Sequence, residues 1–416
     1  MQVSLRFALG VAVVGGGAVA CNALTGVGDL HVTGDGAGGA VASGGAGQGP
    51  GSGTANGGAA NGPGTGPSSG GAGPTGPSGS SSATTASGPT TSSSSGGPTC
   101  SPACGPNAFC EAQTSSCVCD PGFSMQGGQC IAVAPGDPST HTQADVCTHW
   151  TEGHAITTPS PLTASGQQCD PGTLKQGAIT DTLTRIDMFR WLVGLGPVVD
   201  DANIDQNEQA CANLEAWWDF SSPDSPHAPP PTATCYTAAG GMAAGQSNIA
   251  WGSGHPANSI DQYIQDTGSG NRPLLGHRRW VLNPPLDPIG IGYWETGGTY
   301  GNASCLYVFG GSGSGPNPPW NSIPPAGFTP IELTQYAWSF EGSLGGIPGA
   351  TVTVLRVDDD TQLPVTMQAL AQGYGQDATS WYPNGWTAEV GKTYRVTVSG
   401  VSGGPIVYDV KPVACN

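Results

Sequence analysis

One histidine next to two arginines marks the part of the sequence best suited to chemistry. The segment 276–294 reads GHRRWVLNPPLDPIGIGYW, in which His277 precedes a proline-rich turn and an alternating apolar run. An imidazole can transfer protons, bind a metal ion or pack as a hydrogen-bonded polar group. His277 is therefore either a chemical group or a packed residue in a structural hinge. Four other histidines lie in segments rich in Pro, Gly and Thr and are expected to be exposed loop residues: His141, His149, His154 and His255.

Three of the 11 basic residues cluster around this histidine. They are Arg272, Arg278 and Arg279. In so acidic a chain, we expect them to pair with helix carboxylates such as Asp261 or Glu215. The alternative is that they attract an anionic ligand or a lipid headgroup to the mouth of a cleft.

Helices and strands that would position these side chains can be read from the spacing of the apolar residues. Three segments have helical spacing, and Asp181 is expected to cap the first of them. Two later runs are strand-like. Helices followed by strands with short connections indicate an α+β fold in layers. The predicted helices are 180–193, 201–218 and 258–266, and the predicted strands are 289–294 and 305–311.

Residues 326–416 follow a different pattern, in which apolar and polar residues alternate between Gly, Pro and Asp clusters. This pattern predicts an antiparallel all-β sandwich. Four aromatic residues are expected in its core or at its contact with the preceding domain, and a tryptophan among them could instead stack on carbohydrate. They are Trp338, Phe340, Trp381 and Trp386.

Residues 145–325 carry a series of motifs that occur in the same order in a known family. The motifs are RIDMFRWLVGLGPVVDD, SPHAPP, GQSNIAWG, IDQYIQD and GHRRWVLNPP followed by IGIGYW. Through them the chain resembles the CAP superfamily, which groups cysteine-rich secretory proteins, insect antigen 5 and plant pathogenesis-related 1 proteins. The resemblance implies a CAP-like α-β-α sandwich. The following β-domain also looks like one that accompanies this module in some bacterial members.

The CAP resemblance also implies a site. Family members commonly gather two histidines and two carboxylates in a central cleft, which in some members holds a divalent metal. The matching positions here are His227, Ser247, Asp266 and His277, so a serine replaces one carboxylate and the other is shortened. Two imidazoles and Asp266 could hold zinc and leave a fourth position open, whereas a serine hydroxyl is a poor zinc ligand. Alternatively, the histidines bridge helices and line a cleft without metal.

A hydrolase is the catalytic alternative. Ser247 and His277 could share a cleft, as in protease claims made for parts of this superfamily. Ser247 lacks the G-x-S-x-G context of a nucleophile elbow, however, and sequence order cannot establish a hydrogen bond between the two side chains.

The N-terminus predicts export. Residues 1–20 contain one arginine, a short apolar stretch and small residues, as in a signal peptide. The ending AVAC resembles a bacterial lipobox, which implies lipidation of Cys21 and sorting to the outer membrane or cell surface. Otherwise the protein is secreted and Cys21 is an incidental thiol. Residues 33–98 are almost entirely Gly, Ser, Thr, Ala and Pro, so we predict that 21–98 form a lipidated N-terminus and disordered tether.

Thirteen cysteines leave an even number once Cys21 is removed. In residues 99–131, a CxCxxGF signature resembles an EGF-like module and implies the pairs Cys100–Cys110, Cys104–Cys117 and Cys119–Cys130. No calcium site is expected there, because the acidic and Asn residues of calcium-binding members are missing. For the remaining cysteines, short loops favour Cys147–Cys169, Cys211–Cys235 and Cys305–Cys415, although six cysteines allow fifteen pairings.

The net charge of the chain excludes one class of function. With 11 basic against 29 acidic residues the formal net charge is −18, which excludes a nucleic-acid footprint. We expect a surface lipoprotein, anchored in the membrane by its lipid, that displays a non-catalytic binding domain to an extracellular protein, lipid or polysaccharide. An extracellular hydrolase, metal-dependent or Ser/His, is the first alternative, and a structural envelope component is the second.

Overall fold

The computed structural model describes residues 100–101, 103–111, 115–126, 128–132, 134–295 and 301–415. The predicted signal peptide, the lipidation site Cys21 and the tether 21–98 lie outside these residues. In the described part, no helix is long and apolar enough to cross a membrane. Helices and sheets are both present, which confirms the α+β prediction.

We call residues 100–132 the N-terminal module. It contains two antiparallel β-hairpins. Strand β1 (Ala108–Glu111) pairs with β2 (Ser116–Cys119), and β3 (Phe123–Gln126) pairs with β4 (Gln129–Ala132). So short a segment cannot bury a sufficient apolar core, and disulfides take over that role. The three predicted pairs are present: Cys100–Cys110, Cys104–Cys117 and Cys119–Cys130.

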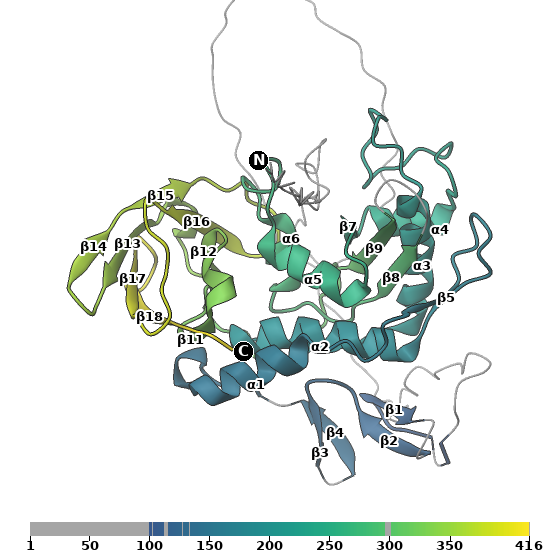
Figure 1. The fold of residues 1–416 in the computed structure, drawn as a ribbon, viewed down its shortest axis with the longest axis horizontal. Helices are drawn as coiled ribbons and strands as arrows, with labels where there is room; N and C mark the ends of the chain where they lie inside the picture. Colours follow the sequence, from purple (N-terminus) through teal and green to yellow (C-terminus); the bar gives the residue numbers. More distant parts are fainter. Residues whose placement is uncertain are drawn as a thin grey trace, which may run out of the picture. The chain divides into compact units, whose positions relative to one another are not determined.

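A three-stranded antiparallel sheet follows, with helices on both faces. Its strand order is β7-β9-β8. Helices α3 and α4 cover one face, while α5 lies on the other and packs against α2, which contacts α1 (Figure 1). The helices are α1 (Gln143–Gly153), α2 (Gln176–Leu192), α3 (Ala202–Ala216), α4 (Ala238–Ala244), α5 (Pro256–Gln265) and α6 (Gly276–Val281). The strands are β7 (Ser247–Trp251), β8 (Ile291–Glu295) and β9 (Asn302–Tyr307), with a separate small pair β5 (Leu162–Thr163) and β6 (Thr173–Leu174).

Successive residues of the sheet alternate between two apolar cores. Ile249 and Trp251 of β7, with Cys305 of β9, belong to the smaller core beside α3 and α4. Ala250 and Leu306 belong to the larger core, which α2 and α5 share. Because side chains along a strand point alternately to the two faces, both faces need a helical cover, and every residue of β7 is buried.

Strand β8 begins where the proline-rich turn ends, as predicted. Ile289, Ile291 and Tyr293 all face the larger core. β8 lies at the edge of the sheet, and β9 is its central strand. Gly292 lies so close to the backbone of Glu208 that a side chain at this position would collide with α3.

Residues 320–413 form two sheets around a shared aromatic and aliphatic core. Trp338, Phe340 and Trp381 are fully buried in it, and Trp386 packs against it. Pairing is antiparallel except between β11 and β18. The region starts before the predicted boundary at 325, because β10 already pairs with β12. One sheet contains β10 (Trp320–Ile323), β12 (Trp338–Gly342), β16 (Asp377–Pro383) and β15 (Val365–Gln368). The other contains β11 (Gly327–Pro330), β18 (Ile406–Val413), β17 (Tyr394–Ser399), β13 (Thr351–Arg356) and β14 (Thr361–Leu363).

The disulfides outside the N-terminal module correct the short-loop prediction. The observed pairs are Cys147–Cys415, Cys169–Cys235 and Cys211–Cys305, with sequence separations of 268, 66 and 94 residues. Loop length favoured neighbours, but the fold had already brought the distant cysteines together. Cys211 on α3 faces Cys305 on β9 in the smaller core, and Cys147 links α1 to the end of the chain.

The predicted partners of the clustered arginines are also wrong. Arg278 and Arg279 are fully buried and donate to backbone carbonyls, several of them in the C-terminal sheet region. Asp261 pairs instead with Arg185. The guanidinium of Arg272 lies 5.7 Å from the ring centre of Tyr382. These arginines join the helical part to the C-terminal sheets rather than facing a cleft mouth.

His255 corrects the expectation of an exposed loop histidine. It is 3% exposed and caps α5, because its Nδ1 accepts a hydrogen bond of 3.1 Å from the backbone of Ala257. Its Nε2 lies 3.2 Å from the carbonyl of Thr158. His141 and His149 are both partly covered, since each stacks on the ring of Trp191.

Asp181 does not cap α2. The helix begins earlier, at Gln176, and Asp181 is a buried residue inside it. Its carboxylate accepts hydrogen bonds from the backbone of Thr157 and Thr158. It therefore holds the segment after α1 against the side of the helix.

A buried pair of histidines as the candidate functional site

His277 is held by the end of the preceding helix. Its Nδ1 lies 2.8 Å from Oδ1 of Asp266, and both side chains are almost fully buried. Asp266 ends α5 in the left-handed conformation, with φ 46°. Its second oxygen accepts a 3.3 Å hydrogen bond from the backbone of Arg278 in α6. Asp266 thus fixes the imidazole and the start of its helix together, and Nε2 is the ring nitrogen of His277 that this contact leaves unused.

His227 lies between α3 and α4, and a carbonyl group holds it. Its Nδ1 is 2.9 Å from the backbone oxygen of Ala244. A carbonyl oxygen only accepts, so Nδ1 carries the hydrogen and Nε2 carries the lone pair. Burial lowers the pKa of His227 to about 4, and the nearby charge of His277 contributes in the same direction. At neutral pH the ring is therefore uncharged.

The two Nε2 atoms share one unusual property. Those of His227 and His277 are both buried and have no hydrogen-bond partner among the described residues. Buried polar atoms are normally paired, so these two atoms need an explanation such as an unseen ion or water. Two imidazole nitrogens, each on a ring that is held through its Nδ1, are suitable ligands for zinc, copper or nickel.

The structure gives Asp266 a different role from that of the metal ligand that the CAP resemblance implies. The resemblance had assigned it to the metal ligands, whereas its oxygens bind His277 and Arg278. A carboxylate that accepts from the far nitrogen of a metal-ligating histidine fixes its tautomer and raises its basicity. The structure therefore leaves His227 and His277 as possible ligands, and Asp266 is bound to the second of them.

Ser247 is bound to a glutamate that the sequence reasoning missed. Its Oγ lies 2.5 Å from Oε2 of Glu208 on α3 and 2.7 Å from the carbonyl oxygen of Ala243. A hydroxyl donates one hydrogen, so both bonds form when Glu208 is protonated and donates to Ser247. Burial raises the pKa of Glu208 well above its usual range, in agreement with that protonated state. In the sequence, the signal that could have identified Glu208 was its place among the apolar positions of a predicted helix.

Replacing Ser247 with alanine is expected to lower the free energy of unfolding by about 1–3 kcal/mol. The change leaves Glu208 and the carbonyl of Ala243 without their shared partner. Urea unfolding followed by tryptophan fluorescence measures the loss. Ser312→Ala, which removes a hydroxyl from an exposed residue, is the matched control and should change the value by less than about 0.5 kcal/mol. Equal stabilities would show that the buried bonds do not form.

The described residues contain two tighter groups of possible metal ligands, but neither is a metal site. One is Cys100, Cys104 and Cys110, and the other is Glu208, Cys211 and Cys305. Cys100 is paired with Cys110, and Cys211 with Cys305, so their sulfurs are not thiolates. Metal binding by a cysteine requires the thiolate.

Comparison with family models, with curated proteins and with solved structures finds no match. The geometry of the chain itself therefore carries the functional argument.

Proposed function

We propose that this protein is an exported, lipid-anchored surface protein whose CAP-like domain, within residues 145–325, is a non-catalytic binding module. In this proposal, His227 and His277 hold a divalent transition-metal ion such as zinc. Residues 99–131 are an EGF-like spacer, and the region of two sheets that begins with β10 at Trp320 is a β-sandwich that supports the module.

Disulfide chemistry supports the exported location. Twelve cysteines form six pairs, and such a framework persists in oxidising compartments outside the cytosol. The thirteenth, Cys21, is then free for a lipid that anchors the chain at the outer membrane. Helices on both faces of a small sheet, and three module disulfides in the EGF-like order, support the two domain assignments.

The observation that carries the metal assignment is the pair of buried, unpartnered Nε2 atoms in His227 and His277. A metal held by two imidazoles keeps open coordination positions, which an oxygen or nitrogen donor of an extracellular ligand could occupy. The ion would supply a Lewis-acid contact point, and the histidines would fix its place.

Binding is favoured over hydrolysis because the serine is engaged elsewhere. The hydroxyl of Ser247 has Glu208 and Ala243 as its partners, and the described hydrogen bonds include none from it to His277. A serine nucleophile needs a base within hydrogen-bond reach. The Ser/His alternative therefore has no geometric support in the described part of the chain.

Zinc titration tests the proposal. The full-length protein is stripped with a chelator, dialysed and titrated with Zn²⁺ in a calorimeter. We expect one principal site, and His227→Ala and His277→Ala should each weaken it by at least about tenfold, because each removes one of two protein ligands.

His255→Asn is the matched control. His255 is also buried, but both of its ring nitrogens have partners, and asparagine keeps an acceptor at the helix cap. The zinc affinity of the His255→Asn variant should equal that of the unchanged protein. Absence of zinc binding, or equal binding by the His227→Ala/His277→Ala double variant, would contradict the metal assignment and favour a purely structural envelope role.

A further inference from the structure

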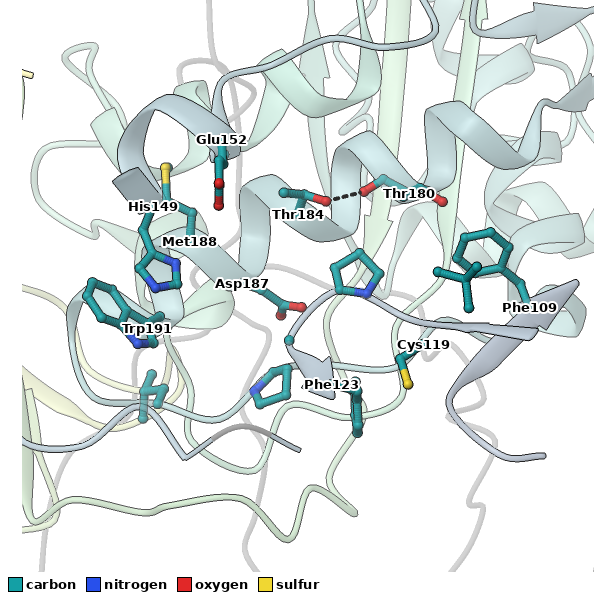
Figure 2. A pocket seen from close by; sticks show the side chains of 16 residues that line it. Phe109, Cys119, Phe123, His149, Glu152, Thr180, Thr184, Asp187, Met188 and Trp191 are labelled. Carbon is teal, nitrogen blue, oxygen red and sulfur yellow. Dashed lines mark hydrogen bonds between the residues drawn. The ribbon is translucent and has the colours of Figure 1, made fainter. Parts of the chain in front are cut away.

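A cleft lies where the N-terminal module meets α1 and α2, and neither His227 nor His277 lines it. It has a volume of about 410 Å³, and its wall is mainly apolar (Figure 2). Volumes of this size are typical of small-molecule sites. Phe109, Val118 and Phe123 come from the module, and Met188 and Trp191 come from α2.

Close contact between the module and the helix shapes this cleft. Gly122, with φ 76°, lies against Pro197 and Asp187, so that a side chain at this position would collide with both. Val118 is 37% exposed, although it is a large apolar side chain in the cleft wall. The cleft therefore offers apolar surface that the protein itself does not cover.

Asp187 on α2 provides a polar atom in the cleft wall. Its side chain is labelled in the close-up of the cleft, and the residue is 8% exposed (Figure 2). Oδ1 accepts a 3.0 Å hydrogen bond from the backbone of Val198. Oδ2 is buried and has no hydrogen-bond partner among the described residues. An orphaned oxygen beside an apolar cleft calls for an explanation such as a water or a ligand contact.

The protonation of Asp187 determines which contact it can make. Burial raises its pKa to about 8, so at pH 7 the carboxyl is mostly uncharged and Oδ2 can donate a hydrogen. Asp120 from the module and Asp287 from the turn after α6 act in the same direction, while Arg190 opposes them. His149 and Glu152 of α1 also line the cleft.

These charges disfavour an ionic occupant. The acidic groups Asp120, Asp287 and Glu152 oppose an anion. The guanidinium of Arg190 is fully buried close to Asp187 and opposes a cation, although it bonds to carbonyl oxygens rather than to that carboxyl. An uncharged molecule is repelled neither by the acidic groups nor by the guanidinium.

We propose that this cleft binds an uncharged, largely apolar small molecule whose carbonyl or hydroxyl oxygen accepts a hydrogen bond from Oδ2 of Asp187. The apolar body of the ligand would lie between the module and α2. The cleft and its occupant are independent of the proposed metal site, so either proposal can fail without the other.

Prodan, 6-propionyl-2-dimethylaminonaphthalene, is a suitable probe because it is uncharged and aromatic and carries one ketone. Its emission shifts to shorter wavelength when it leaves water. Titrated with the full-length protein at pH 7, it should show a saturable shift. Absence of a shift would overturn the proposal.

Thr184→Trp locates the probe. Thr184 lines the cleft from α2, and its hydroxyl bonds only to the backbone of its own helix, so an indole should fill the cleft at little cost to folding. Gln176→Trp at the exposed start of α2 is the control. Prodan affinity should fall at least about tenfold in the first variant and stay unchanged in the second. Equal affinities would place the probe elsewhere and overturn the proposal.

Asp187→Asn tests the hydrogen bond. In the unchanged protein, the donor hydrogen is present below pH 8 and is lost above it, so Prodan affinity should fall several-fold between pH 7 and pH 9. Asparagine keeps an acceptor for Val198 and donates from its amide at every pH, so the variant should bind equally at both. The same fall in both proteins would exclude Asp187 as the donor. A preference for a cationic or anionic naphthalene probe over Prodan would likewise contradict the proposed ligand class.

Discussion

Replacing Arg278 with methionine is expected to lower the free energy of unfolding by about 3–5 kcal/mol. The guanidinium is fully buried and donates to the carbonyls of Ile264 and Ala337, at 2.6 and 2.7 Å, and to the hydroxyl of Ser339 at 3.1 Å. Methionine has a similar length but no donor. The substitution would strand these acceptors and remove a positive charge close to the buried carboxyl of Glu341.

Urea unfolding at pH 7, followed by tryptophan fluorescence, measures this loss. Arg395→Met is the matched control, because Arg395 is 45% exposed and pairs with Asp409 on the surface. An exposed ion pair contributes about 1 kcal/mol or less, so the control should remain close to the unchanged protein. If the two variants lost equal stability, the buried bonds that Arg278 of α6 makes would not be a main link between the helical part and the C-terminal sheets.

Local pattern predicted the elements well, because each depends on residues close in sequence. The apolar spacing in 258–266 identified α5, and the alternation around Val396 identified β17. The proline-rich turn lies immediately before the predicted strand at Ile289, where β8 follows α6. Such signals follow from helix and strand geometry alone.

Long-range pairings were not predictable in the same way. Cys147 lies 268 residues from its partner Cys415, and no local rule connects them. His255 looked like a loop residue because Gly and Pro surround it, yet the pairing of both ring nitrogens occurs inside the fold. The entropy of loop closure favours pairing between residues close in sequence, but tertiary packing decides which side chains meet.

The same difference between local patterns and long-range contacts applies to the candidate site. His227 and His277 were identified from motifs, whereas the role of Asp266 depends on the backbone turn that ends α5. Glu208 was missed because its partner, Ser247, lies on a strand that crosses α3. Motifs can thus point to candidate histidines, while the groups that orient them are found only in three dimensions.

Buried carboxyls recur in this chain, although only 10% of its residues are charged. Burial raises the pKa of Asp187 and of Glu341 to about 8 each. Glu208 and Glu215 are shifted in the same direction. Each of these groups is protonated in the folded protein at a pH where the unfolded chain is ionised, so together they make stability fall as pH rises above the unfolded pKa of about 4.

Glu215 isolates this effect, and replacing it with methionine is expected to stabilise the protein. The residue is fully buried on α3, and neither carboxyl oxygen has a hydrogen-bond partner among the described residues. Burial alone raises its pKa. At pH 7 the gain in unfolding free energy should be about 1–4 kcal/mol, the range seen when buried ionisable groups are replaced by apolar ones of similar volume.

The pH dependence of that gain separates it from simple packing. At a pH between the unfolded pKa and the raised folded pKa, Glu215 takes up a proton on folding, so the advantage of Glu215→Met should be small at pH 4 and grow as the pH rises. Glu389→Met, at a side chain that is 60% exposed, should give no such trend. Urea unfolding of both variants at pH 4, 6 and 8 provides the comparison. A loss of stability in Glu215→Met at every pH would mean that this carboxyl makes a favourable buried contact, and that the smaller core is built around it rather than in spite of it.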